Sequence, residues 1–326
     1  MPKKEIGIII PAYKGTYLSE TLESIISQTD QGFEIYVGDD CSPDDIESIV
    51  GRYSKERSIH YHRFNDRLGG ISLAGHWERC ISLGNEPWVW LFSDDDVMEP
   101  RCIEALREHI RESRSRYEVF RLDTLIIDGT GEVYDINPPN PEQEGWMAFL
   151  YFWIRKLRQC TMPEWVFSRK AFERNGGFVK FPLAWGSDVA TIIKLAAPHG
   201  IRTVKGPRVL FRKSDYNISS IRDREVVKRK IDAEMQFVRW LHSFLEGHPD
   251  REFPLDGDVV KKLSRIWFLE RLKDHHVYLD VGLLLRIFRF MQGTWHYPGV
   301  RSLAWLGIIN FNVALYLLYR MVRSRR

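Results

Sequence analysis

The segment WVWLFSDDDVMEP, residues 88–100, places three consecutive aspartates directly after an apolar run. The short continuous apolar stretch at residues 88–92 predicts a strand that is buried on both faces. Neighbouring carboxylates repel one another, and each resists leaving water. Three of them at a strand end exceed what one helix terminus can satisfy, so the cluster predicts a bound cation.

The chain on either side of this segment alternates between strand and helix patterns. Strands are predicted at residues 6–10, 33–37, 58–64 and 88–92, and helices at 18–28, 71–83 and from about Pro100. Ser42, followed by Pro43 and an acid three residues on, is predicted to cap another helix. This alternation indicates an α/β fold with a mostly parallel sheet and helices on both faces.

Composition bounds the class of protein. The chain has 326 residues and is 44% hydrophobic, which is enough for a large core. A net charge of only +3 argues against a nucleic-acid partner. The four cysteines lack metal-binding spacing and predict buried, reduced thiols. The apolar run that follows the first lysines is too short for a signal peptide, so we expect a cytoplasmic protein.

The pattern changes after residue 117. We expect a hairpin at 117–127 and 132–136, a helix at 146–157, a strand at 164–168, a helix at 189–197 and a strand pair within 201–211. From about residue 223 the chain is mainly helical and rich in basic and apolar residues. The predicted organisation is a catalytic domain at 1–220 and a helical C-terminal region at 221–326.

Polar residues follow each predicted strand of the first domain, where an open parallel sheet binds its ligands. They are Pro11 to Gly15, Asp39 and Asp40, the loop 65–70, and Asp94 to Asp96. An Asx turn before Ser42 and a helix-dipole interaction after Asp96 are the structural alternatives. Oxygen ligands suit Mg²⁺ or Mn²⁺, and such an ion would also bind a diphosphate.

Four stretches carry a family resemblance: IGIIIPAYKG, FEIYVGDDCSPDD, the loop 65–70 and LFSDDDVMEP. In this order and spacing they resemble the family 2 glycosyltransferases over roughly residues 5–215. The resemblance implies a GT-A fold, a Rossmann-like sheet flanked by helices. It also implies inverting transfer of a sugar from a nucleotide-diphosphate donor, with a UDP-sugar expected.

The same resemblance implies roles for individual residues. Tyr13, after Pro11, would lie against the nucleotide base, and Asp40 would bind the base or ribose with Asp39 beside it. Arg67 would reach the nucleotide from its loop. The metal ligands would be Asp94, Asp95 and Asp96. Ser93 stands where relatives often carry the first acid, so Asp95 is the principal expected ligand for Mn²⁺ or Mg²⁺.

An inverting transfer also needs a base. In the family an acid at a helix start after a Gly-Gly-Phe turn takes this role, which here implies Asp188; its alternative is an N-cap. Arg212 falls where relatives contact the diphosphate, and an exposed ion pair is its alternative. His76 either replaces a family asparagine or is a helix-surface residue, and we favour the latter.

The C-terminal region suggests a membrane surface as partner. Residues 303–322 match a bilayer span in length, but Asn310 and Asn312 disfavour insertion. The preceding mixture of arginines and aromatic residues is typical of an interfacial helix, and the basic tail would face anionic lipid. Packing on the catalytic domain or a homodimer contact is the alternative. A membrane-associated enzyme at the inner face of the cell membrane would suit a saccharide or lipid-linked saccharide acceptor.

Other functional classes fit these residues less well. A nucleotidyltransferase would carry a glycine-rich, basic loop after the first strand, where PAYKG has one glycine. A phosphatase or a phosphoacceptor domain would place its acids after strand one. A catalytically weak sugar-nucleotide-binding scaffold stays open, because Ser93 and Ser187 both replace acids.

Overall fold

The computed structural model describes residues 4–214, 217–248, 255–275 and 278–309. It divides into two compact units, Met1–Ser220 and Ile221–Arg326. The first unit is built around one mixed sheet in the order β3-β2-β1-β4-β9-β6-β10-β5. Its strands are β1 (Ile6–Ala12), β2 (Phe33–Asp39), β3 (His60–Arg63), β4 (Trp88–Leu91), β5 (Val97–Met98), β6 (Val119–Ile127), β7 (Val133–Ile136), β8 (Gln143–Glu144), β9 (Trp165–Ser168) and β10 (Ile201–Arg212).

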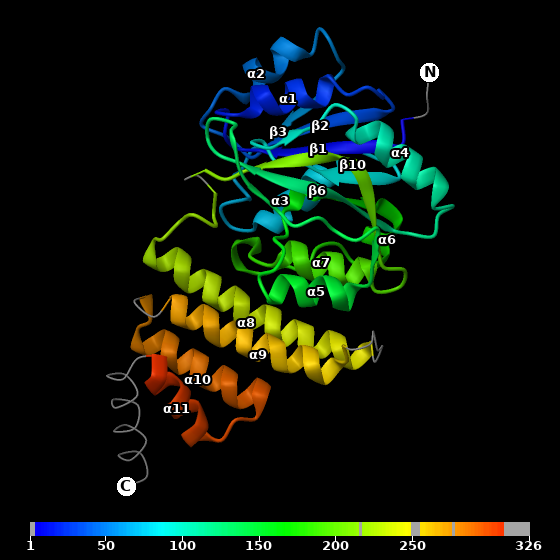
Figure 1. Cartoon of the computed structure of the whole chain (residues 1–326). Coiled ribbons are helices and arrows are strands. Elements are labelled where there is room, and N and C mark those ends of the chain that lie inside the picture. Colours follow the sequence, from blue (N-terminus) through cyan, green and yellow to red (C-terminus); the bar gives the residue numbers. More distant parts are fainter. Residues whose placement is uncertain (1–3, 215–216, 249–254, 276–277, 310–326) are drawn as a thin grey trace. The chain divides into compact units, whose positions relative to one another are not determined.

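Helices cover both faces of this sheet (Figure 1). They are α1 (Leu18–Ile26), α2 (Ile46–Tyr53), α3 (Leu73–Ile81), α4 (Cys102–Glu112), α5 (Trp146–Ile154), α6 (Arg169–Arg174) and α7 (Ser187–Ala196), with short 3₁₀ turns η1 (Met162–Glu164) and η2 (Pro182–Ala184). In Figure 1, α1 and α2 lie on one side of the sheet, and α5 and α7 lie on the other. This arrangement confirms the predicted α/β class.

The first four predicted strands form the parallel half of the sheet. β1 pairs in parallel with β2 and β4, and β2 pairs in parallel with β3. The isoleucines at 6, 8 and 10 of β1 are fully buried in one cluster with side chains from α1, α2 and α4. Burying so much apolar area is the main stabilising term for this half of the fold.

β1 runs two residues further than predicted, through Pro11 to Ala12. Pro11 lacks an amide hydrogen, yet both residues remain paired with β2. Pairing with β4 has already stopped at Ile9 and Leu91. The missing donor is therefore tolerated, because the strand has an open side at this point.

Two further sequence predictions needed correction. Asp45, and not Ser42, is the N-cap of α2, with its side chain accepting a bond from the Ser48 amide. The predicted strand pair at 201–211 is one long strand, β10, whose register with β6 shifts between Val204 and Arg208. Gly206, at a φ of 105°, turns the chain through this bulge. The hairpin of β6 and β7 is as predicted.

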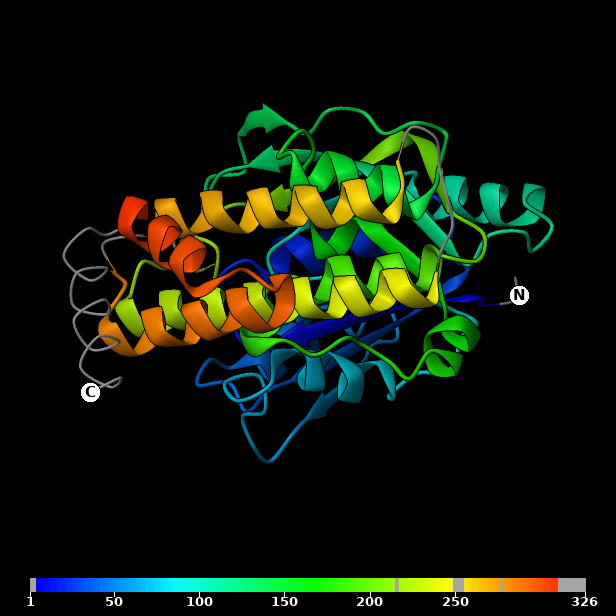
Figure 2. The same cartoon turned by 90° about the horizontal axis from the view of Figure 1, so that it is seen from below.

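The second unit is helical. Its elements are α8 (Arg224–Gly247), α9 (Gly257–Asp274), α10 (Val281–Trp295) and α11 (Gly299–Ile309). Seen from below, α9 lies beside α8, and α10 lies in front of α8 (Figure 2). Asp223, Asp256 and Asp280 cap their first turns. Within the described part of the chain, no helix combines the length and apolarity needed to cross a bilayer. The predicted segment 303–322 lies mostly outside the described residues.

Candidate active site

The candidate site lies where the strand order of the sheet reverses. β1 has β2 on one side and β4 on the other. Ligands bind outside the carboxyl ends of strands at such a switch point. The segments that leave β1, β2 and β4 there carry Tyr13, Asp39, Asp40 and the three aspartates 94–96.

Asp94 ties the segment after β4 to the segment after β1. Its Oδ2 accepts hydrogen bonds from the amides of Tyr13 and Lys14 at 2.8 and 2.9 Å. Burial raises the pKa of Asp94, and these amide bonds act in the opposite direction. On the other side, the Ser42 hydroxyl donates to the Tyr13 carbonyl at 2.6 Å. The backbone at Tyr13 is therefore fixed by both neighbouring loops.

The Tyr13 ring has a cation as its neighbour. The Arg67 guanidinium carbon lies 4.1 Å from the ring centroid, within cation–π range. Tyr13 and Arg67, which the resemblance assigns to the nucleotide, thus lie in contact although they come from different loops. Pro11, the third residue at this strand end, is paired with Gly38 of β2.

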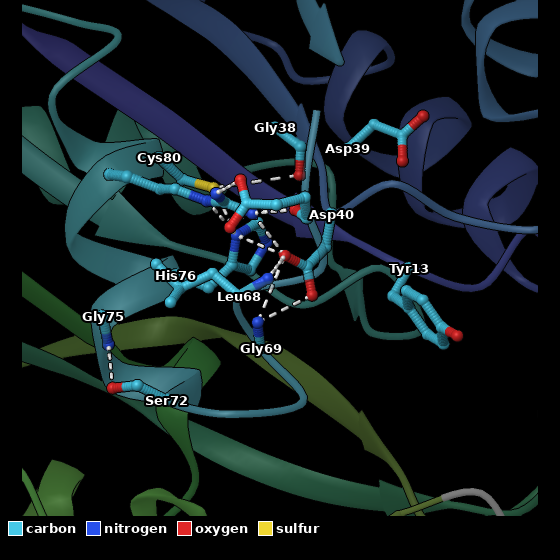
Figure 3. A network of polar contacts seen from close by, with 12 residues as sticks. Tyr13, Gly38, Asp39, Asp40, Leu68, Gly69, Ser72, Gly75, His76 and Cys80 are labelled. Carbon is cyan, nitrogen blue, oxygen red and sulfur yellow. Dashed lines mark hydrogen bonds and ion pairs between the residues drawn. The ribbon is translucent and has the colours of Figure 1, made fainter. Parts of the chain in front are cut away.

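Asp39 and Asp40 point in different directions (Figure 3), as successive side chains at a strand end do. Asp39 is fully buried, and its Oδ1 accepts from the Ser42 amide at 2.7 Å. Its Oδ2 accepts from the Tyr61 hydroxyl and from Arg63 Nη1. Burial is the larger cause, and the hydrogen bond to Asp39 the next, of a rise in the pKa of Tyr61 to about 12. Asp39 therefore holds the loop and β3 together.

The Asp40 carboxylate binds backbone amides of the loop 65–70 (Figure 3). Its Oδ1 accepts from the Leu68 amide at 2.9 Å, and its Oδ2 accepts from the Gly69 amide at 2.9 Å. A Cβ at Gly69 would lie 2.5 Å from Asp40 Oδ2, which is too close for any larger residue. Glycine at 69 is what allows the loop to close on the carboxylate.

Arg79 of α3 is a site residue that sequence reasoning missed. Its Nη2 donates to Asp40 Oδ1 at 2.5 Å, and its Nη1 donates to Asp66 at 2.8 Å. The guanidinium also lies 3.9 Å from the centroid of the Phe64 ring. One side chain thus joins Asp40 to the loop that carries Arg67.

His76 orients this arginine. Arg79 Nε donates to His76 Nδ1 at 3.0 Å, and burial lowers the pKa of His76 to about 4, so the ring is neutral and accepts. The favoured interpretation of His76 as a helix-surface residue is wrong, because the residue is only 2% exposed. Its three-residue spacing from Arg79 on one helix face is the signal that could have paired them.

Replacing Arg79 tests this support of Asp40. We expect Arg79→Ala to weaken nucleotide binding by roughly 10- to 100-fold, because a charged hydrogen bond to a buried carboxylate is lost. Arg79→Lys keeps the positive charge but lacks the planar guanidinium that bonds two partners at once, so it should give an intermediate loss of nucleotide affinity. Calorimetric titration with UDP measures both. Arg169→Lys is the matched control, since the hydrogen bonds that Arg169 donates to described residues go to the backbone carbonyls of Glu86 and Ile81. Equal losses in Arg79→Lys and the control would contradict a role specific to Asp40.

Asp95 and Asp96 differ in their surroundings. Burial, and then repulsion from Asp94, raises the pKa of Asp95 to about 7. Asp96 is fully buried: its Oδ1 accepts from the Arg212 amide at 2.8 Å, and its Oδ2 has no hydrogen-bond partner within the described residues. Burial and the Asp95 charge raise the pKa of Asp96 well above its usual value. Asp94 and Asp95 are partly exposed, whereas Asp96 is buried.

Arg212, predicted at the diphosphate, is buried and surrounded by protein acceptors. Its Nε donates to the Asp95 carbonyl at 2.8 Å, Nη1 donates to the Asp128 carbonyl at 3.1 Å, and Nη2 pairs with Glu20. The guanidinium also lies 4.3 Å from the Tyr17 ring centroid. Arg212 is only 1% exposed, and its contacts hold the segment 94–96 in place. It is not the exposed ion pair considered as its alternative.

A divalent cation at this edge would need carboxylate or other oxygen ligands. No cluster of three or more His, Cys, Asp or Glu side chains is poised to hold a metal within the ranges the structure describes. The partly exposed Asp95 carboxyl group and the unpartnered Asp96 oxygen nonetheless supply oxygen ligands that a cation could bind once it displaces their protons. One or two carboxylates completed by substrate phosphates is the arrangement that Mg²⁺ commonly adopts. The residues present fit that arrangement.

Asp188 lies in the first turn of α7. Gly186, at a φ of 79°, is the N-cap, so Asp188 is the second helical residue and not the cap. Burial raises the pKa of Asp188 to about 6, with its neighbouring amides acting in the opposite direction. A carboxylate with that pKa is mostly ionised at neutral pH yet basic enough to accept a proton.

The turn before α7 is fastened at several points that the sequence did not reveal. Lys194 Nζ donates to the carbonyls of Asn175 and Gly177 at 2.8 and 2.7 Å. Ser187 stands where the family carries a glutamate, and its hydroxyl accepts a hydrogen bond from the Phe181 amide at 3.0 Å. These bonds fix the start of α7. No hydrogen bond or ion pair joins Asp188 to the aspartates at 39, 40 or 94–96 in the described part of the chain.

Comparison with known proteins extends these observations. The family model "Glycosyl transferase family 2" matches residues 7–175. Glycosyltransferase GlyG of Streptococcus pneumoniae is 28% identical over 177 residues, 54% of this chain and 52% of that protein. Succinoglycan biosynthesis protein ExoO of Rhizobium meliloti is 24% identical over 181 residues, 54% of this chain and 46% of that protein. The matched part thus spans about half the length of these relatives.

Solved structures of Staphylococcus aureus TarS share the fold. The TarS fragment 1-349 in complex with UDP-GlcNAc has a TM-score of 0.57 at 16% identity, covering 91% of this chain and 88% of that one. The same fragment has also been solved with UDP. This likeness confirms the expected GT-A fold. Since the family model matches more than half of the 326 residues, the chain belongs to glycosyl transferase family 2.

Proposed function

We propose that this protein transfers a sugar, with inversion, from a nucleotide-diphosphate donor to an acceptor hydroxyl. The observation that carries the proposal is the convergence at the switch point of the sheet. There the Asp94 carboxylate binds the backbone of Tyr13 and Lys14, and Asp95 follows it. This convergence would bring the residues proposed for the nucleotide and for the diphosphate to one edge of the sheet, as family membership leads us to expect.

The donor base would stack on Tyr13 with Arg67 beside it, and its edge would donate to Asp40. Uracil carries one ring N–H flanked by two carbonyl oxygens, which suits an acceptor carboxylate with a nearby cation. Thymine shares this edge, so these residues favour a UDP- or dTDP-sugar over a purine nucleotide, and a UDP-sugar is the donor we propose. The UDP complexes of TarS support the same donor class.

A divalent cation, Mn²⁺ or Mg²⁺, would be held by Asp95 with help from Asp94 and Asp96. Such an ion supplies neutralisation of the leaving diphosphate. The role we propose for Arg212 is to position Asp95 and Asp96 through their backbone and side-chain contacts, in place of direct contact with the diphosphate.

Asp188 would act as the general base. It would take the proton from the acceptor hydroxyl as that oxygen bonds to the anomeric carbon. The bond from the anomeric carbon to the diphosphate oxygen breaks on the opposite face, and the nucleoside diphosphate leaves. A pKa of about 6 leaves Asp188 ionised for this step near neutral pH.

The acceptor class follows from the relatives and from the C-terminal region. GlyG and ExoO are glycosyltransferase or polysaccharide biosynthesis proteins by name. We infer an acceptor that is a saccharide or lipid-linked saccharide of polysaccharide biosynthesis, with peripheral attachment of the protein to the membrane. A homodimer through the C-terminal helices is the competing role for that region.

The test is turnover of a donor panel. UDP-, GDP- and dTDP-sugars are incubated with Mn²⁺ and the full chain, and release of nucleoside diphosphate is measured with and without saccharide acceptors. We expect one donor, a UDP-sugar, to be consumed. Failure of all donors to turn over, together with measurable UDP binding, would identify a sugar-nucleotide-binding scaffold instead.

A further inference from the structure

The second unit contains a basic groove that the proposed transferase site does not use. It has a volume of about 520 Å³ and lies along α9, with residues of α11 and the segment before it completing the lining. The lining carries two acids, Asp258 and Glu270, against five basic residues: Lys261, Lys262, Arg265, Lys273 and Arg301. We define these residues, with Tyr297 and Trp305, as the α9 groove.

The helix pattern explains why the basic residues gather there. Along α9, positions 258, 262, 265, 269 and 273 recur every three or four residues and share one face. The opposite face packs inward through buried residues such as Val260, Trp267 and Phe268. Leu269 on the same face is also buried, so the basic residues of α9 lie around an apolar centre and not on a fully exposed face.

Tyr297 gathers two of the cations. The guanidinium carbons of Arg301 and Arg265 lie 4.5 and 6.0 Å from its ring centroid. Arg265 Nε is buried and has no hydrogen-bond acceptor within the described residues. For Arg265, Arg301 and Lys262, no ion pair with a described carboxylate exists. These cations outnumber the two acids of the lining and repel one another, and an anion would relieve that repulsion.

The pKa of the buried residue His242 is also affected by these positive charges. His242 of α8 is bonded to Ser264 on α9, and its pKa is lowered to about 4 by burial and by the charges of Arg265 and Lys261. The chain's own tail is a poor occupant, because its last seven residues add four arginines and no acid. The occupant of the groove should therefore be anionic and come from outside the chain.

We propose that the α9 groove binds the phosphate headgroups of anionic membrane lipids. Phosphate oxygens would accept from Arg265, Arg301 and Lys262, and Tyr297 and Trp305 supply the amphipathic rings that are common at a membrane interface. Exposed apolar side chains nearby, Ile266 at 40% and Val300 at 81%, would enter the headgroup layer. The proposal deepens the membrane attachment inferred above and does not depend on the sugar-transfer chemistry.

Vesicle flotation of the full chain tests it. Vesicles of phosphatidylcholine alone are compared with phosphatidylcholine mixed with phosphatidylglycerol. We expect binding only to the anionic vesicles. Arg265→Gln/Arg301→Gln should lower the partition coefficient by on the order of 25-fold, about fivefold for each cation removed. The exposed Lys262→Gln should give about a fivefold loss without risk to folding.

The matched control is Arg286→Gln/Arg289→Gln, which removes the same charge from exposed positions of α10 outside the groove. Equal losses in the groove and control variants would overturn the site in favour of a diffuse surface charge. Binding to neutral vesicles as strong as to anionic ones would also overturn it. Thermal stabilisation by inorganic phosphate in wild type but not in Lys262→Gln, without vesicle binding, would assign the groove to a soluble phosphate instead. Donor turnover is measured separately, so failure of either proposal is distinguishable from failure of the other.

Discussion

Asp188→Asn is expected to lower kcat by roughly 10²- to 10⁴-fold, the usual contribution of a general base. Asparagine matches the size of aspartate but cannot accept a proton from the acceptor hydroxyl. Donor binding should change little, since no described hydrogen bond or ion pair links Asp188 to the aspartates of the nucleotide site. Single-turnover rates and UDP titrations of the same preparation separate these two quantities.

The pH dependence of the reaction tests the same residue. Burial raises the pKa of Asp188 to about 6. The base must be ionised to act, so kcat/KM should be near its plateau above pH 7 and should fall as pH drops through 6. With Mn²⁺ kept saturating at every pH, Asp188→Asn should lower the rate and remove this decrease at acidic pH.

Asp45→Asn is the matched control for Asp188→Asn. Asp45 also lies at a helix start, and asparagine caps a helix about as well as aspartate. Its kcat should equal that of wild type. If Asp188→Asn retained wild-type kcat, Asp188 would not be the base.

Asp95→Asn should remove metal-dependent donor binding. We expect Mn²⁺-dependent UDP affinity to fall by roughly 10²- to 10³-fold, because the neutral amide is a far weaker ligand for a hard cation. In wild type, the metal must displace the proton of a carboxyl whose pKa is about 7. Apparent metal affinity should therefore rise with pH up to about 7 and level off above it.

The same substitution should stabilise the fold in the absence of metal. The pKa of Asp95 is raised in the folded state, so the folded chain holds this proton more tightly than the unfolded chain does. Its unfavourable contribution is absent below pH 4, grows as pH rises to 7, and is constant above. We expect Asp95→Asn to raise the free energy of unfolding at pH 8 by on the order of 2–4 kcal/mol.

Chemical denaturation at pH 4 and pH 8 measures this gain. Asp135→Asn, on the exposed strand β7, should leave both stability and metal binding unchanged. Unchanged Mn²⁺-dependent affinity in Asp95→Asn would contradict the metal assignment. Destabilisation at pH 8 would contradict the unfavourable burial and repulsion of the Asp95 charge.

The parallel half of the sheet was predictable because its signals are local. The isoleucines at 6, 8, 9 and 10 and the run at 88–92 form strands through their own apolar patterns. The carboxyl ends of parallel strands meet at one edge, so the positions of Tyr13, Asp40 and Asp94 followed from sequence order. The cap of α2 was predicted three residues early, since Ser42 instead bonds the Tyr13 carbonyl across a loop.

The partners of the site residues were decided by tertiary structure. Nothing local relates Asp40 to Gly69 and Arg79, which lie 29 and 39 residues away in the chain, or Asp96 to Arg212 at 116 residues. Those contacts determine which acids are already satisfied and which retain uncompensated charge. The sequence alone determined which residues stand at the candidate ligand-binding edge. Burial and long-range hydrogen bonds determined their pKa values, because desolvation depends on neighbours that only folding brings together.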